Sequence, residues 1–154
     1  MNLNDYSRIR FLDKGRDRDG CDCWGLVKLV YAERFGIDLP GYEEVYQHTK
    51  DKDSITTAIP QEAEKHWIDL YPDFKTPLEL SKIRPRRERY GDVVLMRIMG
   101  LPWHVGIVGE AGKVLHVEPG TDSICEGYLC TKWERRILGF YRHASLCQGR
   151  NPAF

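Results

Sequence analysis

The spacing of apolar residues changes once along this chain, from helical to alternating, and this change limits the folds it can adopt. Between Cys23 and Phe35 the apolar residues recur at helical spacing. Asp22 before this segment is a good N-cap, and Gly36 after it is a typical helix stop. Later apolar runs are short and separated by turn residues, which predicts strands at 92–97, 103–108, 113–117 and 137–141. One helix ahead of a mostly antiparallel sheet predicts an α+β fold.

The length of 154 residues fits one domain over residues 1–154, because a single core typically serves about 100–200 residues. Residues 42–89 differ from the rest, since they are highly charged and contain four prolines. We therefore expect a charged insertion at 42–89 within the domain. A short helix from Pro60 through Trp67 is predicted inside it. The basic run 84–89 lacks periodicity and is expected to form a solvated face.

Charge and hydropathy exclude several classes of partner. The chain has 23 Lys and Arg residues against 23 Asp and Glu, and coating nucleic acid or an anionic membrane needs a positive surplus. No apolar run approaches the roughly 20 residues of a membrane span. Residues 1–11 lack the apolar core of a signal peptide, so we expect no export by such a signal.

The five cysteines are expected to be free thiols, a metal site or a nucleophile rather than a disulfide framework. An odd number without an export signal argues against a disulfide framework. The spacings Cys21-x-Cys23 and Cys125-x4-Cys130 are not the paired spacing of a zinc knuckle, and Cys147 stands alone. We therefore expect neither a metal nor another cofactor.

Cys23 has two interpretations. In the first turn of the predicted helix, the helix dipole would lower the pKa of its thiol, and unpaired backbone N–H groups could hold an oxyanion. Gly25 lies two residues later, and glycine inside a helix costs about 1 kcal/mol relative to alanine. This predicts that another backbone or a substrate comes close to Gly25. The alternative is that Cys23 is a small buried hydrophobe without reactivity.

Two histidines on the predicted hairpin favour the nucleophile. In one predicted strand, His104 lies on the opposite face from Val105 and Ile107, and His116 lies in the next strand. If Val108 pairs with Gly112 around a three-residue loop, His104 faces His116 directly. A thiolate nucleophile needs a base, and the base needs an orienting partner. The spacing thus predicts a Cys/His/His arrangement in which the helix carries the cysteine and the sheet carries both histidines.

Five short motifs, in order, resemble the NlpC-type cell-wall cysteine peptidases, a papain-like family. They are Asp22-Cys23-Trp24-Gly25-Leu26-Val27, Gly36-Ile37-Asp38-Leu39-Pro40, Tyr90-Gly91-Asp92-Val93-Val94, His104-Val105-Gly106-Ile107 and Leu115-His116. The resemblance implies a papain-like core with Cys23 as nucleophile, His104 as base and His116 as orienting residue. It also implies cleavage of the D-Glu to diaminopimelate (or Lys) bond in peptidoglycan stem peptides.

The substrate-binding positions implied by the resemblance are Asp22, Trp24 and Phe11. Trp24 stands where many members have a serine that helps to hold the stem peptide. Phe11 stands where many have a tyrosine whose hydroxyl assists the oxyanion, and Tyr6 could replace it only if the loop brings it in. These departures leave open a structural role with a closed or vestigial site. An amidase or acyltransferase on the same scaffold is a third class.

A narrower resemblance concerns the version of this family in the tail-assembly proteins of lambda-like phages and gene-transfer agents. It rests on residues 22–27 together with Leu138-Gly139-Phe140-Tyr141-Arg142-His143. It implies a tail-tip protein assembled in the host cytoplasm that acts on the host cell wall, with other tail-tip proteins as partners. The absent signal peptide agrees with this expectation.

Overall fold

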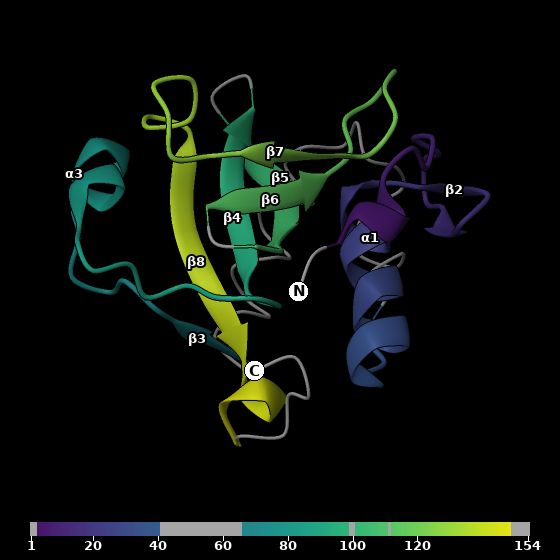
Figure 1. The fold of residues 1–154 in the computed structure, drawn as a ribbon, viewed down its shortest axis with the longest axis horizontal. Helices are drawn as coiled ribbons and strands as arrows, with labels where there is room; N and C mark the ends of the chain where they lie inside the picture. Colours follow the sequence, from purple (N-terminus) through teal and green to yellow (C-terminus); the bar gives the residue numbers. More distant parts are fainter. Residues whose placement is uncertain (1–2, 41–65, 99–100, 111, 149–154) are drawn as a thin grey trace.

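A computed structural model describes residues 3–40, 66–98, 101–110 and 112–148. Figure 1 shows a curved sheet with helices on either side. The strands are β1 Arg16–Asp17, β2 Gly20–Cys21, β3 Trp67–Asp69, β4 Val93–Ile98, β5 Leu101–Val108, β6 Lys113–His116, β7 Ile124–Gly127 and β8 Ile137–His143. The helices are α1 Cys23–Val30, the π-helical turn η2 Tyr31–Phe35, α3 Pro77–Lys82, and the 3₁₀ turns η1 Asn4–Tyr6 and η3 Ala144–Gln148. Within these residues, no helix has the length and apolar character needed to cross a bilayer.

The main sheet has six strands in the order β3-β8-β4-β5-β6-β7, and every neighbouring pair is antiparallel. The predicted α+β class is therefore confirmed. All four predicted strands are present as β4, β5, β6 and β8. The two strands of the main sheet that the sequence pattern missed, β3 and β7, are its edges; the short pair β1–β2, in a separate sheet, was missed as well. Strands β3 and β7 have three and four residues and are largely exposed, so neither presents an apolar alternation.

Helix α1 begins at Cys23, as predicted. The carboxylate of Asp22 accepts a hydrogen bond from the Gly25 backbone N–H at 2.7 Å, which satisfies one of the free donors of the first turn. Every residue of α1 except Lys28 is buried. The helix continues through η2 to Gly36, whose φ of +67° ends it in the left-handed conformation that glycine favours.

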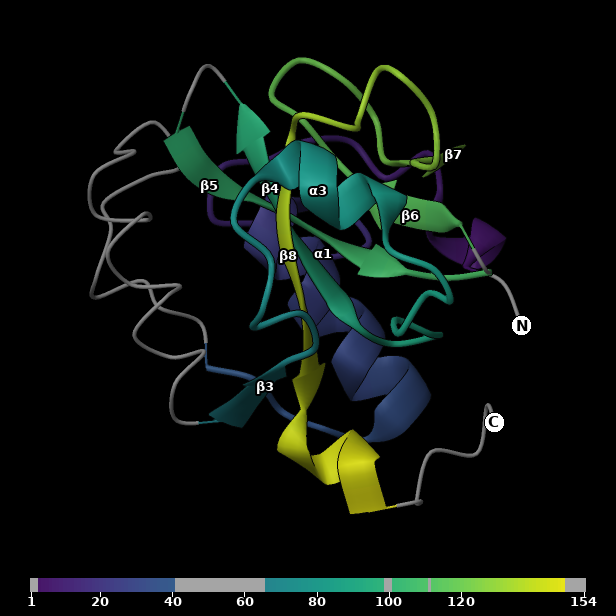
Figure 2. The ribbon, with the colours of Figure 1, turned by 90° about the vertical axis from the view of Figure 1, so that its left-hand side faces the viewer.

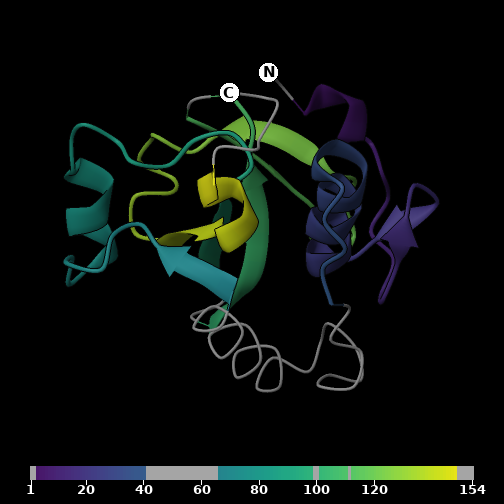
Figure 3. The same cartoon turned by 90° about the horizontal axis from the view of Figure 1, so that it is seen from below.

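The sheet separates two hydrophobic clusters. Val93 and Leu95 of β4 belong to the cluster beside α1, whereas Val94 and Met96, which alternate with them, belong to the cluster beside α3. Figures 2 and 3 show α1 and α3 on opposite faces of the sheet. This alternation is the strand period that the sequence displays after residue 92.

The predicted insertion at 42–89 lies partly outside the described residues, since 41–65 are not described. Its described part joins the sheet, because β3 pairs with β8 and Leu80 of α3 is buried in the second cluster. The predicted helix from Pro60 also falls largely outside the described residues. Its predicted end is wrong, because Trp67 begins strand β3 and its pairing with His143 holds it extended.

Candidate active site

Cys23 lies in the first turn of α1, where α1 packs against β5. Its side chain is buried, with 3% of the residue exposed. Burial, together with the nearby Asp22 carboxylate, raises the pKa of the Cys23 thiol to about 12, although the backbone N–H groups of Val105 and Trp24 act in the opposite direction. The expected lowering of this pKa by the helix dipole is therefore wrong for the closed site, because desolvation is the larger effect.

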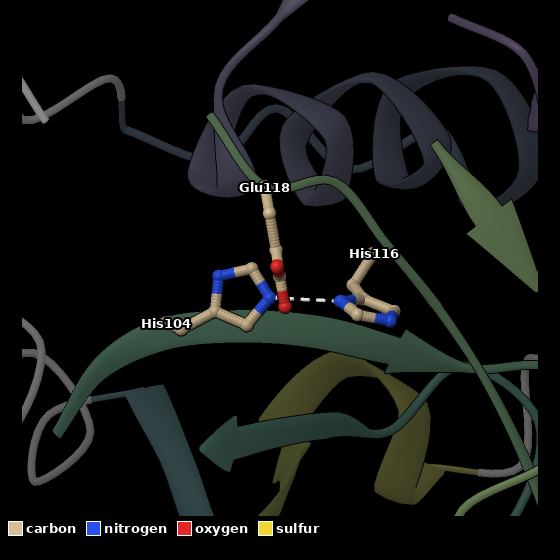
Figure 4. Close-up of side chains that lie close together, drawn as sticks. All are labelled: His104, His116 and Glu118. Carbon is tan, nitrogen blue, oxygen red and sulfur yellow. Dashed lines mark hydrogen bonds between the residues drawn. The ribbon is translucent and has the colours of Figure 1, made fainter. Parts of the chain in front are cut away.

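The two histidines contact each other in the interior. His104 Nε2 and His116 Nδ1 are hydrogen-bonded at 2.9 Å, with the rings edge to face at 5.1 Å between centroids (Figure 4). Both are buried, at 0% and 2% exposure. Burial, and the neighbouring His116, hold the pKa of His104 well below its usual range. His104 is therefore a neutral imidazole at neutral pH, which is the form a general base requires.

The predicted register of the hairpin is wrong by two residues. Val108 pairs with Val114 rather than with Gly112, and Gly109 donates a hydrogen bond to the carbonyl of Lys113. Gly112 has a φ of +78° and lies in the turn, so it is not a strand residue. A shift of two residues keeps every side chain on its predicted face. His104 and His116 therefore still meet, although they are not directly opposite.

A third polar side chain continues from the histidines. His116 Nε2 is hydrogen-bonded to Glu126 Oε2 at 2.8 Å. The other carboxylate oxygen accepts hydrogen bonds from Lys132 Nζ at 3.1 Å and Trp133 Nε1 at 3.3 Å. Sequence reasoning missed Glu126 because it missed β7. The only available signal was its position between the apolar Cys125 and Gly127, which is too short to identify a strand.

One group of side chains in the described part of the chain could hold a metal ion. The ligand atoms of His104, His116 and Glu118 lie within 4.8 Å of one another (Figure 4). Imidazole nitrogens and a carboxylate suit Zn²⁺. A cation there would take the place of the hydrogen bond between His104 and His116. All five cysteines are free, so none forms a disulfide, and none belongs to this group.

Asp22, one of the expected substrate-binding residues, is engaged in structural contacts. Asp22 is fully buried and also binds Arg16 Nη1 at 2.8 Å and the Lys14 backbone N–H at 3.1 Å. Its substrate-binding role stays a prediction. Burial raises the pKa of its carboxyl, while Arg16 and the helix N–H act against this shift.

The aromatic positions near the site are also engaged in packing. Trp24 is buried, donates from Nε1 to the Pro40 carbonyl at 2.7 Å, and packs edge to face on Trp67. Phe11 is half-buried against the α1-side cluster. The Tyr6 hydroxyl donates to Glu33 at 2.9 Å, beyond the far end of α1, so Tyr6 does not take the place of the missing oxyanion tyrosine. The substrate roles of Trp24 and Phe11 stay predictions.

Gly25 allows the close approach that its position in the helix predicts. A Cβ atom there would lie 1.9 Å from the backbone carbonyl oxygen of Gly15, which means that the loop before β1 runs directly against α1. The approaching group is thus the protein's own backbone.

A cysteine on the first turn of a helix, packed on an antiparallel sheet with paired histidines, defines a papain-like cysteine peptidase fold. The model of the NlpC/P60 family matches residues 10–142, and the chain belongs to this family.

Two solved structures share the fold. The NlpC/p60 domain of the peptidoglycan hydrolase SagA is 21% identical, with a TM-score of 0.51 over 89% of this chain and 88% of that domain. A lipoprotein-like protein of the NLP/P60 family from Staphylococcus aureus subsp. aureus Mu50 is 19% identical, with a TM-score of 0.51. That alignment covers 90% of this chain and 37% of the Staphylococcus protein. A search of curated proteins gave no match.

Proposed function

We propose that this chain is a cysteine endopeptidase that cleaves the stem peptide of peptidoglycan at the D-Glu to diaminopimelate (or Lys) bond. The observation that carries the proposal is the hydrogen bond between His104 and His116. His104 is next in sequence to Val105 on β5, and the backbone N–H of Val105 is hydrogen-bonded to the Cys23 sulfur. Membership of the NlpC/P60 family supports the substrate class, as does the name of one structural neighbour, a peptidoglycan hydrolase.

In the proposed reaction, the proton of the Cys23 thiol passes to His104 and the sulfur attacks the amide carbon. The carbon–nitrogen bond breaks, and the proton on His104 goes to the leaving amine, which leaves a thioester on Cys23. Water then gives a proton to His104 and attacks the thioester carbon, and the acid leaves as the sulfur regains its proton. The backbone N–H of Cys23, in the first turn of α1, holds the oxyanion.

Digestion of purified peptidoglycan followed by mass analysis of the fragments tests this function. Wild type and Cys147→Ala, which removes an exposed cysteine, are expected to release the same new fragments. Cys23→Ala is expected to release none. Equal amounts of product from wild type and Cys23→Ala would exclude the mechanism.

A structural role is the second candidate, and burial of the site is the observation that favours it. With Cys23 and both histidines at most 3% exposed, a substrate has to displace covering side chains before it reaches the sulfur. If wild type releases no fragments, even at high enzyme concentration, the closed site is a structural remnant.

We also propose that the chain acts as a tail-tip component of a phage or gene-transfer agent, with other tail-tip proteins as partners and the host cell wall as its place of action. The resemblance of residues 22–27 and 138–143 to such proteins supports this assignment. Peptide mass mapping of purified particles tests it, and particles that lack peptides of this chain would exclude it.

A further inference from the structure

The chain of contacts at the site extends past the two histidines to a carboxylate on the sheet edge. It runs from His104 Nε2 to His116 Nδ1 at 2.9 Å, and from His116 Nε2 to Glu126 Oε2 at 2.8 Å. His116 faces Ile124 in the β6–β7 pairing, and Glu126 is two residues further along β7, so its side chain reaches His116 diagonally on the same face. Each nitrogen of His116 is therefore engaged by a different partner.

Glu126 is itself held in place. Its Oε1 accepts hydrogen bonds from Lys132 and Trp133, which directs Oε2 at His116. Trp133 is fully buried and packs edge to face on the His116 ring, with centroids 5.4 Å apart. Both carboxylate oxygens of Glu126 therefore face nitrogen atoms of their partners, and a carboxylate can only accept hydrogen bonds.

This arrangement determines where the protons lie when both histidines are neutral. A carboxylate at Nε2 requires the His116 proton to be on Nε2, so His116 Nδ1 is left as an acceptor. His104 must then donate from Nε2, which leaves the lone pair of His104 on Nδ1. When His104 takes up the Cys23 proton, the resulting imidazolium is linked through His116 to a negative charge.

We propose that Glu126 is a positioning residue that fixes the tautomers of His116 and His104, so that His104 Nδ1 is the basic nitrogen. The catalytic role of His104 Nδ1 rests on the proposed peptidase function, whereas the assignment of the two tautomers does not. The function of the site would then depend on a residue at the exposed edge of the sheet.

Nitrogen-15 NMR of the histidine side chains is the direct test, because it reads tautomers without any substrate. The variants are Glu126→Gln and Glu126→Ala, with Glu110→Ala, an exposed carboxylate on the β5–β6 loop, as the control. Wild type and the control are expected to carry the Nε2–H tautomer at both His104 and His116. Glu126→Ala is expected to give mixed tautomers at His116, with a folded far-ultraviolet spectrum. Unchanged tautomers in both Glu126 variants would overturn the proposal.

Peptidoglycan kinetics separate this proposal from the proposed function. The Glu126 variants are expected to lose about 10- to 100-fold in kcat with little change in KM, because they misplace a base rather than remove a substrate contact. Full kcat in Glu126→Ala beside an active wild type would contradict the positioning role. If wild type is inactive but its tautomers shift on substitution, the function fails and the assignment of Glu126 stands.

Discussion

Two opposing effects act on the thiol of Cys23. The first turn of a helix stabilises a negative charge by about 0.3–1 kcal/mol in exposed settings and up to about 2 kcal/mol when partly buried. Full burial shifts a pKa by as much as 3–5 units, equivalent to about 4–7 kcal/mol. Burial is the larger effect at Cys23, which is why the pKa of its thiol rises to about 12. A position that predicts an activated thiolate therefore holds a protonated thiol while the site is closed.

This difference predicts slow alkylation of Cys23. At pH 7.5, iodoacetamide is expected to modify Cys23 about 1,000-fold more slowly than the exposed Cys130 and Cys147, because so little of a thiol with a pKa of about 12 is ionised. The rate at Cys23 should rise about tenfold per pH unit through pH 10, since the thiolate fraction does so below the pKa. Peptide mass mapping over time measures all three rates together. Faster labelling of Cys23 than of Cys147 at pH 7.5 would mean that the site opens readily and carries a thiolate.

At the scale of single elements, the end of β8 is joined to the start of β4 by an ion pair whose carboxylate is buried. Arg142 Nε and Nη2 donate to the two oxygens of Asp92 at 2.9 and 2.8 Å. The Asp92 carboxylate also accepts the Arg89 backbone N–H at 2.8 Å. The Arg142 and Asp92 side chains are 14% and 1% exposed, so the Asp92 carboxylate has almost no access to water and the Arg142 guanidinium has only partial access. The pair joins two of the sequence motifs that are far apart in the chain.

Asp92→Ala is expected to lower the free energy of unfolding by about 3 kcal/mol, the lower end of the range for buried pairs, because Arg142 loses its charged partner but keeps partial access to water and its bond to the Arg87 carbonyl. The matched control is Asp73→Ala, which removes an exposed partner of Arg87 and should leave the stability nearly unchanged. Urea denaturation of the three proteins measures both effects. Equal midpoints for Asp92→Ala and wild type would show that the ion pair does not stabilise the fold.

The close contact between α1 and the preceding loop gives a second prediction at this scale. Gly25→Ala improves helix propensity by about 1 kcal/mol, but its Cβ would lie 1.9 Å from the Gly15 carbonyl oxygen. We expect a net loss of about 1–3 kcal/mol in unfolding free energy, since backbone has to move. In Gly109→Ala the new Cβ meets Leu3 at 3.5 Å, an ordinary contact, so this control should stay close to wild type. Thermal or urea unfolding measures the stability of both variants. A Gly25→Ala variant that is more stable than wild type would contradict this expectation.

How much could be predicted from the sequence follows from how each element is buried. Helix α1 and strands β4, β5, β6 and β8 contribute to the two cores, so their apolar spacing identifies them. The edge strands β3 and β7 are largely exposed, so their sequences have no apolar spacing that would identify them. His104 and His116 could be placed together because side-chain alternation survives a register error of two residues. Glu126 could not, because nothing in the local pattern indicates the strand that carries it.

At the scale of the whole molecule, Ser123 joins the N-terminal segment to the sheet. Its hydroxyl donates to the Tyr6 carbonyl at 2.6 Å and accepts the Ile9 backbone N–H at 2.9 Å. Its own backbone bonds to Ile9 and Arg8 at 2.7 and 2.8 Å. Ser123 is 3% exposed, so these backbone groups have little access to water. Ser123, next to β7, therefore makes four of the hydrogen bonds that hold the segment preceding the family match.

Ser123→Ala is expected to cost about 1–3 kcal/mol in unfolding free energy, because it leaves buried backbone groups without a partner. Ser7→Ala removes a hydroxyl bonded only to the neighbouring Asn4 carbonyl and serves as the control. Calorimetry is expected to give a lower Tm for Ser123→Ala alone. Loss of the Tyr6 contact should also speed proteolysis near the N-terminus, and equal cleavage in both variants would argue against this link.

The two clusters on either side of the sheet each contribute a residue to the site. Cys23 belongs to the cluster beside α1, and Trp133, which packs on His116, belongs to the one beside α3. Cys23 and Trp133, which packs on the His116 ring, are therefore contributed by different halves of the protein. Loosening either half separates them, so a partly unfolded chain carries only an ordinary cysteine. Folding of both halves therefore buries this thiol, so Cys23 is expected to be less reactive in the folded protein than in a partly unfolded chain.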